Sequence, residues 1–152
     1  MKVIKNKKGF TLIELLAVII ILSVLMLIAV PGILRLMDNS RENAFVTQAQ
    51  MVYRAATEQF VLDSTDNLTN DGITYCKDVN NTTEGVSKLE LSGSDNVYYK
   101  IKIDAQGKVL SYHVSNGIYS VKSEGSSNMD ISSIDNDKVK TGSSYEEVSC
   151  AN

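Results

Sequence analysis

The sequence contains few residues of the kinds that build catalytic or metal sites. Its 152 residues include no tryptophan, one proline, one histidine and two cysteines. A metal site needs more ligands than Cys76, Cys150 and the distant His113 supply. His113 also has no cysteine or carboxylate constellation beside it from which a catalytic triad could be built. We therefore expect no metal, no cofactor and no enzyme activity.

Charged side chains are almost absent from the stretch Phe10 to Leu34, which has 25 residues. Between Leu15 and Val30 the only polar side chain is Ser23. As a helix the whole stretch is roughly 37 Å long, enough to cross a hydrocarbon core of about 30 Å. One carboxylate, Glu14, lies inside it, and leaving a carboxylate unpaired near the membrane edge costs on the order of 2–3 kcal/mol. Glu14 therefore needs a partner.

Acidic residues are also absent from the first nine positions, Met1 to Gly9, which carry four lysines. Positive charge before an apolar span keeps that end in the cytoplasm and directs the C-terminus outward. A cut after Gly9 would remove all four charges and expose a new α-amino group at Phe10. The small, flexible glycine lets a protease approach the backbone closely.

The run from Lys7 to Leu16, KKGFTLIELL, resembles the N-terminus of type IV prepilins and the related pseudopilins of secretion and competence machines. In that family a short basic leader ends in glycine, followed by phenylalanine, threonine, leucine, isoleucine or valine, glutamate and then a hydrophobic helix. Glu14 is the fifth residue after Gly9, which is the family's position for the glutamate. Pro31 also stands where many of these proteins have a helix-breaking proline. The resemblance covers about the first third of the chain.

The resemblance implies a structural subunit, a pilin of a type IV pilus-like surface filament. A prepilin peptidase would remove the leader 1–9 by cutting between Gly9 and Phe10, and Phe10 would be N-methylated. The mature protein would wait in the bacterial cytoplasmic membrane as a single-pass protein with its C-terminus outside. An assembly ATPase and a platform protein would then extract it into a helical homo-oligomer on the cell surface. Glu14 would pair with the α-amine of a neighbouring Phe10 and so align incoming subunits.

Other interpretations of this segment remain open at the level of sequence. Within the family, the chain could be a pseudopilin or minor pilin of a type II secretion or competence DNA-uptake machine. Outside it, the segment could anchor a binding domain that keeps residues 1–9 and never polymerises. A secretory signal peptide would need a cleavage site near Ala29, where the sequence matches the small-residue pattern poorly.

Helical periodicity continues beyond the apolar stretch. Apolar residues recur every three or four positions and form one stripe, comprising Phe45, Ala49, Val52, Ala56 and Phe60. We expect residues 10–34 to form the membrane-spanning or filament-core half of a long helix, and residues 35–62 its amphipathic half. Pro31 and Gly32 should kink this helix, and the resemblance implies that this region unwinds when the filament assembles.

Residues 63–152 are predicted to form a small globular domain with a C-terminal loop. Asp63 to Gly72 is rich in residues that end helices and form loops. Alternation of apolar and polar residues predicts strands within residues 97–122, with turns near Gly107 and at Asn116-Gly117. On the second strand we place His113 opposite Leu110, Tyr112 and Val114. The expected fold is α+β, with the apolar face of an antiparallel meander packed on the helix stripe.

The two cysteines, Cys76 and Cys150, should both be outside the cytoplasm, where an even count favours one disulfide. The bond would close a loop of about 75 residues, worth roughly 4 kcal/mol in the loop-entropy account. It would also tie the tail from Glu124 onward to the domain, as in the C-terminal disulfide loop of many pilins. Two free thiols or a metal site are the alternatives.

Net charge bounds the partners. The formal charge of the whole chain is −3, and loss of the four leader lysines leaves 11 basic against 18 acidic residues, a net of −7. Nonspecific binding to nucleic acid depends on basic groups that neutralise phosphates. Nucleic acid is therefore not expected as a main ligand.

Overall fold

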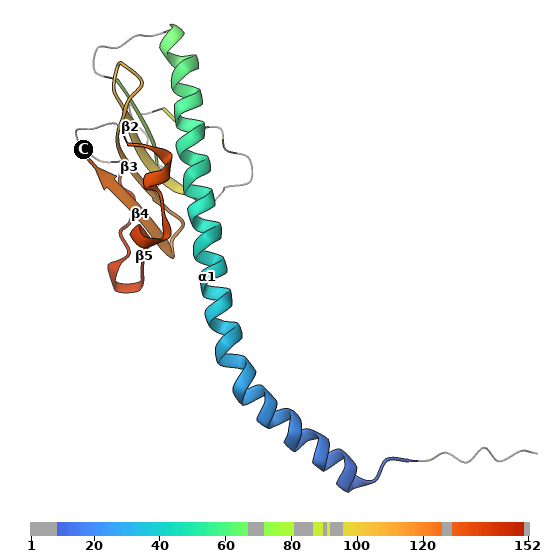
Figure 1. Ribbon diagram of the computed structural model, residues 1–152. Coiled ribbons are helices and arrows are strands. Elements are labelled where there is room, and N and C mark those ends of the chain that lie inside the picture. Colours follow the sequence, from blue (N-terminus) through green and yellow to red (C-terminus); the bar gives the residue numbers. More distant parts are fainter. Residues whose placement is uncertain are drawn as a thin grey trace, which may run out of the picture. The chain divides into compact units, whose positions relative to one another are not determined.

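The computed structural model describes residues 9–66, 72–80, 87–89, 91, 96–125 and 129–150 (Figure 1). Most of the leader, up to Lys8, lies outside the described residues. The chain divides into two compact units, Met1–Ser40 and Arg41–Asn152. One helix of 55 residues, α1 (Leu12–Asp66), contributes to both.

In the first unit, α1 is an apolar helix without a covering layer. Every residue from Thr11 to Ser40 is exposed. Ser23, the one polar residue in the middle of the apolar stretch, satisfies its hydroxyl within the helix by donating a 2.7 Å hydrogen bond to the carbonyl of Ile19. Pro31 lies inside α1, which continues through it. The expected unwinding concerns the assembled filament and stays a prediction.

In the second unit, one face of α1 packs against a sheet and forms the core with it. The predicted helix stripe is buried along its whole length, from Phe45, which is 1% exposed, to Phe60, which is 9% exposed. Its members join one hydrophobic cluster with the inward side chains of the sheet, among them Tyr99, Ile101 and Val114. The expected helix-on-sheet arrangement is confirmed, and the fold is α+β (Figure 1).

The sheet is antiparallel, and its five strands follow one another in space as they do in the sequence. They are β1 (Ile73–Lys77), β2 (Tyr98–Ile103), β3 (Val109–Ser115), β4 (Tyr119–Glu124) and β5 (Lys140–Thr141). The predicted meander is present as β2, β3 and β4. The strands at the two edges, β1 and β5, were not predicted from the sequence.

Strand β3 departs from the predicted alternation at Leu110. Ile103 pairs with Val109 and Lys102 pairs with Ser111, so Leu110 is an extra residue opposite no partner. Such a β-bulge shifts the side-chain alternation by one position. Val109 and Tyr112 both face the core, each 1% exposed, whereas Leu110 is only partly buried and lies outside the core cluster. The prediction that Leu110 shares the apolar face of Tyr112 was wrong.

The end of α1 also differs from the expectation. A loop was predicted from Asp63, but the helix continues to Asp66. Tertiary contacts explain the extension, because the Asp63 carboxylate accepts hydrogen bonds from Gln59 Nε2 at 2.9 Å and from the Tyr75 hydroxyl at 2.7 Å. These bonds hold in the helix a side chain that would otherwise favour a turn.

The hairpin between β3 and β4 turns one residue later than predicted. Asn116 N–H donates to the carbonyl of Tyr119, so Gly117 and Ile118 are the two loop residues. Gly117 has φ of 86°, and the side chain of Asn116 accepts hydrogen bonds from the backbone of both Ile118 and Tyr119. Asn116 therefore stabilises the turn through its side-chain oxygen.

Three short 3-10 turns, η1 (Ile131–Ser133), η2 (Asn136–Lys138) and η3 (Gly142–Ser144), build the tail around β5. The segment before β5 is held on α1 by two long-range hydrogen bonds. Gln50 Nε2 donates to the carbonyl of Ile134 at 3.1 Å, and the Tyr53 hydroxyl donates to the carbonyl of Met129.

Candidate assembly site at the start of the N-terminal helix

The first turn of α1 is closed by a reciprocal pair of side chains, Thr11 and Glu14. The carboxylate oxygen Oε2 of Glu14 accepts two hydrogen bonds of 2.8 Å, one from the backbone N–H of Thr11 and one from its hydroxyl. Glu14 N–H in turn donates to the Thr11 hydroxyl oxygen at 3.3 Å. This is a capping box, in which residues three apart satisfy amide groups that the helix leaves unpaired.

The sequence predicted that Glu14 needs a partner and missed Thr11 as one. The signal was available in the sequence, because threonine followed three residues later by glutamate before an apolar run is the spacing of a capping box. The structure therefore gives Glu14 a partner inside its own chain before any second chain is present.

Around this cap the helix surface is apolar and accessible. Phe10, which precedes the cap, is 92% exposed, and Leu12 and Ile13 are 83% and 72% exposed. Gly9 is also exposed, and a Cβ added to it would have no heavy atom within 4 Å. The Gly9–Phe10 bond is thus open to approach, and the helix that follows needs an apolar environment to cover it.

Residues 4–30 match the family described as the prokaryotic N-terminal methylation motif. The chain carries the prepilin motif of type IV pilin-like proteins. No curated protein and no solved structure matches the chain. The motif marks a type IV pilin-like or pseudopilin protein, a structural class, and its match ends within the first unit.

The pilin-like helix has the length and composition of a membrane span. Among the described helices, α1 is the one that is long and apolar enough to cross a bilayer. This agrees with anchoring in a membrane before assembly.

In the second unit Cys76 and Cys150 form a disulfide, with their Cα atoms 5.8 Å apart. The bond joins β1 to the C-terminal segment, and Cys150 N–H adds a 3.5 Å hydrogen bond to the Asp78 carboxylate. Within the described ranges no cysteine is free, and no group of three or more metal-ligating side chains comes together.

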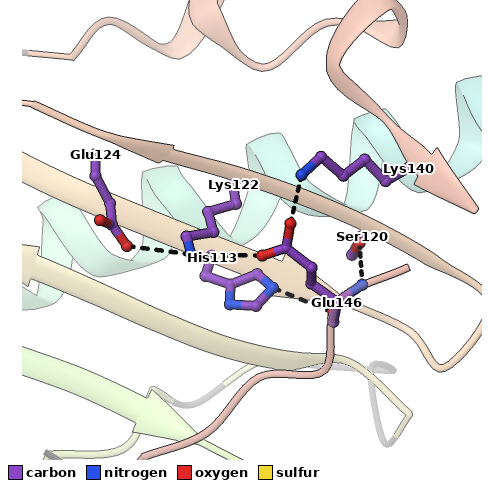
Figure 2. A network of polar contacts seen from close by, with 6 residues as sticks. All are labelled: His113, Ser120, Lys122, Glu124, Lys140 and Glu146. Atoms are coloured by element: carbon purple, nitrogen blue, oxygen red, sulfur yellow. Dashed lines mark hydrogen bonds and ion pairs between the residues drawn. The ribbon is translucent and has the colours of Figure 1, made fainter. Parts of the chain in front are cut away.

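A polar network on the face of the sheet opposite α1 gathers around Glu146 (Figure 2). Lys122 lies 3.4 Å from its carboxylate, and Lys140 pairs with the other carboxylate oxygen. The hydrogen bonds from these two lysines lower the pKa of Glu146, and the bond to Glu146 raises the pKa of Lys122. Glu146 is separated from β3 and β4 by more than 20 residues, and no local pattern in the sequence indicated that it lies there.

His113 was predicted as a surface or cross-strand residue, and it belongs to this network. It is half-buried, and its Nε2 lies 3.2 Å from the carbonyl oxygen of Glu146. Burial is the main reason that the pKa of His113 is lowered, and the charge of Lys122 adds to the effect. The contacts hold a segment of chain in place, and His113 has no nucleophile among them.

Proposed function

We propose that this protein is a structural subunit of a type IV pilus-like surface filament, assembled through α1 after cleavage between Gly9 and Phe10 and N-methylation of Phe10. One observation carries the proposal. A single carboxylate, Glu14, stands at the start of a helix whose next 26 residues are all exposed and mostly apolar.

Such a helix requires lipid before assembly and other copies of itself afterwards. Moving from lipid into a bundle brings no hydrophobic gain in the aqueous sense, so close packing and polar pairs must supply the specificity. The two bonds from Thr11 both end on Oε2 of Glu14. A carboxylate has about four acceptor sites, so Glu14 retains capacity for the ammonium group of Phe10 in a neighbouring subunit.

The cap makes this pairing cheaper to prepare. A carboxylate that already accepts two hydrogen bonds can enter an apolar environment at a lower cost than a bare one. Pairing with the charged amine then offsets the desolvation of both groups, whereas removing one partner of a buried pair costs several kcal/mol. Glu14 would thus favour the register in which each incoming helix meets an amine.

The partners follow from this sequence of events. A prepilin peptidase would remove residues 1–9 at the cytoplasmic face and methylate Phe10. A platform protein and an ATPase would then extract the subunit from the cytoplasmic membrane into an extracellular filament. A pseudopilin or minor pilin, acting in secretion or DNA uptake, would undergo the same processing without forming an abundant surface fibre.

Mass spectrometry of the N-terminus tests the proposal on two samples, material sheared from the cell surface and the membrane fraction. We expect N-methyl-Phe10 as the first residue in the sheared material. Mature Phe10 confined to the membrane would instead favour the pseudopilin or minor-pilin role. An intact Met1 in both samples would overturn the proposal in favour of an anchored domain.

A Gly9→Val variant provides the matched control for processing. A branched side chain at the cut should block the peptidase while leaving the apolar helix unchanged. The variant should accumulate in the membrane with Met1 intact, and no filament should be sheared from the cells.

A further inference from the structure

The outer face of the sheet, opposite α1, is covered by the last described segment of the chain. This strap, residues 145–150, begins beside β3 and ends at the disulfide to β1. Val148 in its middle is 2% exposed but does not belong to the main core cluster. The strap thus buries a small apolar contact of its own on a sheet face that is otherwise polar.

Glu146 fastens the strap with its backbone as well as its side chain (Figure 2). Its N–H donates a 3.0 Å hydrogen bond to the hydroxyl of Ser120 on β4, which is 1% exposed. Its carbonyl oxygen lies 3.2 Å from Nε2 of His113 on β3. Its carboxylate receives Lys122 and Lys140.

The hydrogen bond between His113 and the strap fixes the state of the imidazole. A carbonyl oxygen can only accept, so Nε2 must carry the hydrogen and donate it to Glu146. In the neutral ring Nδ1 is then unprotonated, and a second proton adds there. Acidification therefore adds a positive charge to the ring while leaving the Nε2 bond formally intact.

That charge would arise between two lysines. Lys100 on β2 and Lys122 on β4 are both paired in register with His113, so the three side chains form one row across the outer face. The acidic groups that face this row are Glu124 of β4 and Glu146 and Glu147 of the strap. With Lys140 included, three lysines oppose three carboxylates, and a protonated His113 would give the cluster a net positive charge.

Protons and water have access to the ring. The row borders an open recess of about 290 Å³ on the outer face, lined on its strap side by Glu146, Glu147 and Ser149. His113 is half-buried at this recess, so it can titrate without unfolding of the core.

We propose that the strap is an acid-sensitive clasp, closed over the sheet when His113 is neutral and loosened when His113 is protonated between Lys100 and Lys122. The disulfide at Cys150 keeps the far end attached, so opening exposes the outer face without releasing the chain. The partner surface uncovered is the row of basic side chains on β2, β3 and β4.

The direction of the effect follows from the same contacts. Burial and the charge of Lys122 lower the pKa of His113 below its model value of 6.5, against the opposing effects of Glu146 and Glu124. A lowered histidine pKa means that the closed form is fully stabilised above pH 6.5 and loses stability as the pH falls through that value. Below about pH 4.5 the protonation of Glu146, whose pKa is lowered in the folded state, removes the lysine pairs as well.

Hydrogen exchange of the full chain in detergent micelles, with the disulfide intact, tests the clasp. The opening constant of the strap amides is measured between pH 7.5 and pH 5.0 after correction for the intrinsic exchange rate. We expect it to rise several-fold, up to about tenfold for each unit by which the pKa of His113 is lowered. Amides of β2 should keep the same protection, which distinguishes clasp opening from general unfolding.

His113→Gln is the matched variant, because the amide nitrogen of glutamine can replace Nε2 as a donor but does not titrate. In that variant the strap opening constant should be the same at both pH values. An unchanged constant in the wild type, or an equal rise in His113→Gln, would overturn the proposal.

A second readout requires no substitution. His113 is the only histidine in the chain, so its ring protons give an unambiguous titration by NMR. The midpoint of strap opening should coincide with the midpoint of this titration, and two separate midpoints would also refute the clasp.

Discussion

The hydroxyl of Tyr75, on β1, donates a 2.7 Å hydrogen bond to Oδ2 of Asp63, near the end of α1. Tyr75 is 0% exposed. Burial and the hydrogen bond to the negative carboxylate raise the pKa of Tyr75 well above its usual range. The pair joins the edge strand to the helix and prolongs the helix beyond the position at which its sequence favours a loop.

We expect Tyr75→Phe to destabilise the domain by about 1–2 kcal/mol, since a hydrogen bond to a charged group is lost while the ring still fills its site. Thermal unfolding of the full chain in detergent measures the change. Tyr98→Phe on β2 is the control, because its side chain is only half-buried, and it should stay within about 0.5 kcal/mol of wild type. Equal effects of the two substitutions would show that the Asp63 bond contributes nothing.

Glu14 offers a test of charge against capping. Glu14→Ala removes both functions, whereas Glu14→Gln keeps an acceptor for Thr11 and loses only the charge. We expect both variants to insert into the membrane and both to lose at least about tenfold in sheared filament, because the loss of a buried charge pair costs several kcal/mol.

Ser23→Ala is the control for this pair, because it changes a polar residue of the same helix whose hydroxyl bonds only within α1. It should assemble normally. If Glu14→Gln also assembles normally, capping rather than charge is the contribution of Glu14. Normal filament yield from Glu14→Ala would remove the proposed mechanism.

Gly72 should tolerate no side chain. Its φ is 76°, and a Cβ built there would lie 2.1 Å from the backbone oxygen of Ile103. We expect Gly72→Ala to cost about 3 kcal/mol or more, from backbone strain together with the displacement of β2. Gly142 also has a positive φ, 60°, but has no heavy atom near its Cβ position. Gly142→Ala should therefore cost only about 1–2 kcal/mol, and chemical denaturation that gives equal values would contradict the role of the clash.

The Cys76–Cys150 bond should contribute roughly 4 kcal/mol by closing a long loop, given its sequence separation of 74 residues. Reduction, or replacement of both cysteines by serine, should lower the midpoint of thermal unfolding and increase exchange at Val148 first. An unchanged midpoint after complete reduction, verified by thiol labelling, would show that the strap holds without the bond.

The parts of the fold that repeat with a local period were readable from the sequence. Tyr99, Ile101 and Ile103 alternate with polar residues on β2, and the stripe from Phe45 to Phe60 follows the turns of a helix. Both patterns arise because one face of each element is buried and the other is not.

The edge strands lacked such a pattern. On β1, Tyr75 faces the core and Cys76 is buried on the other face, near the strap, so burial does not alternate there. Strand β5 has two residues, both exposed, and exists because it pairs with Tyr119 and Ser120 of β4. Neither signal is local to the strand itself.

The candidate sites divide in the same way. Gly9, Phe10 and Glu14 stand in a short contiguous motif, so the sequence could indicate them together, and the spacing of Thr11 and Glu14 could have indicated the cap. The Glu146 network joins residues from β3, β4, β5 and the tail. Its geometry is set by the register of the sheet, which only the folded structure reveals.

The consecutive order of the strands bears on how the domain folds. Each strand pairs with the next one along the chain, so the sheet can grow from short closures that cost little chain entropy, a topology that favours rapid folding. The strap is the exception, because Cys150 must reach back past β4 and β3 to Cys76 on β1. The sheet therefore forms before the thiols meet, and oxidation seals a domain whose pairing is already complete instead of guiding the chain toward it.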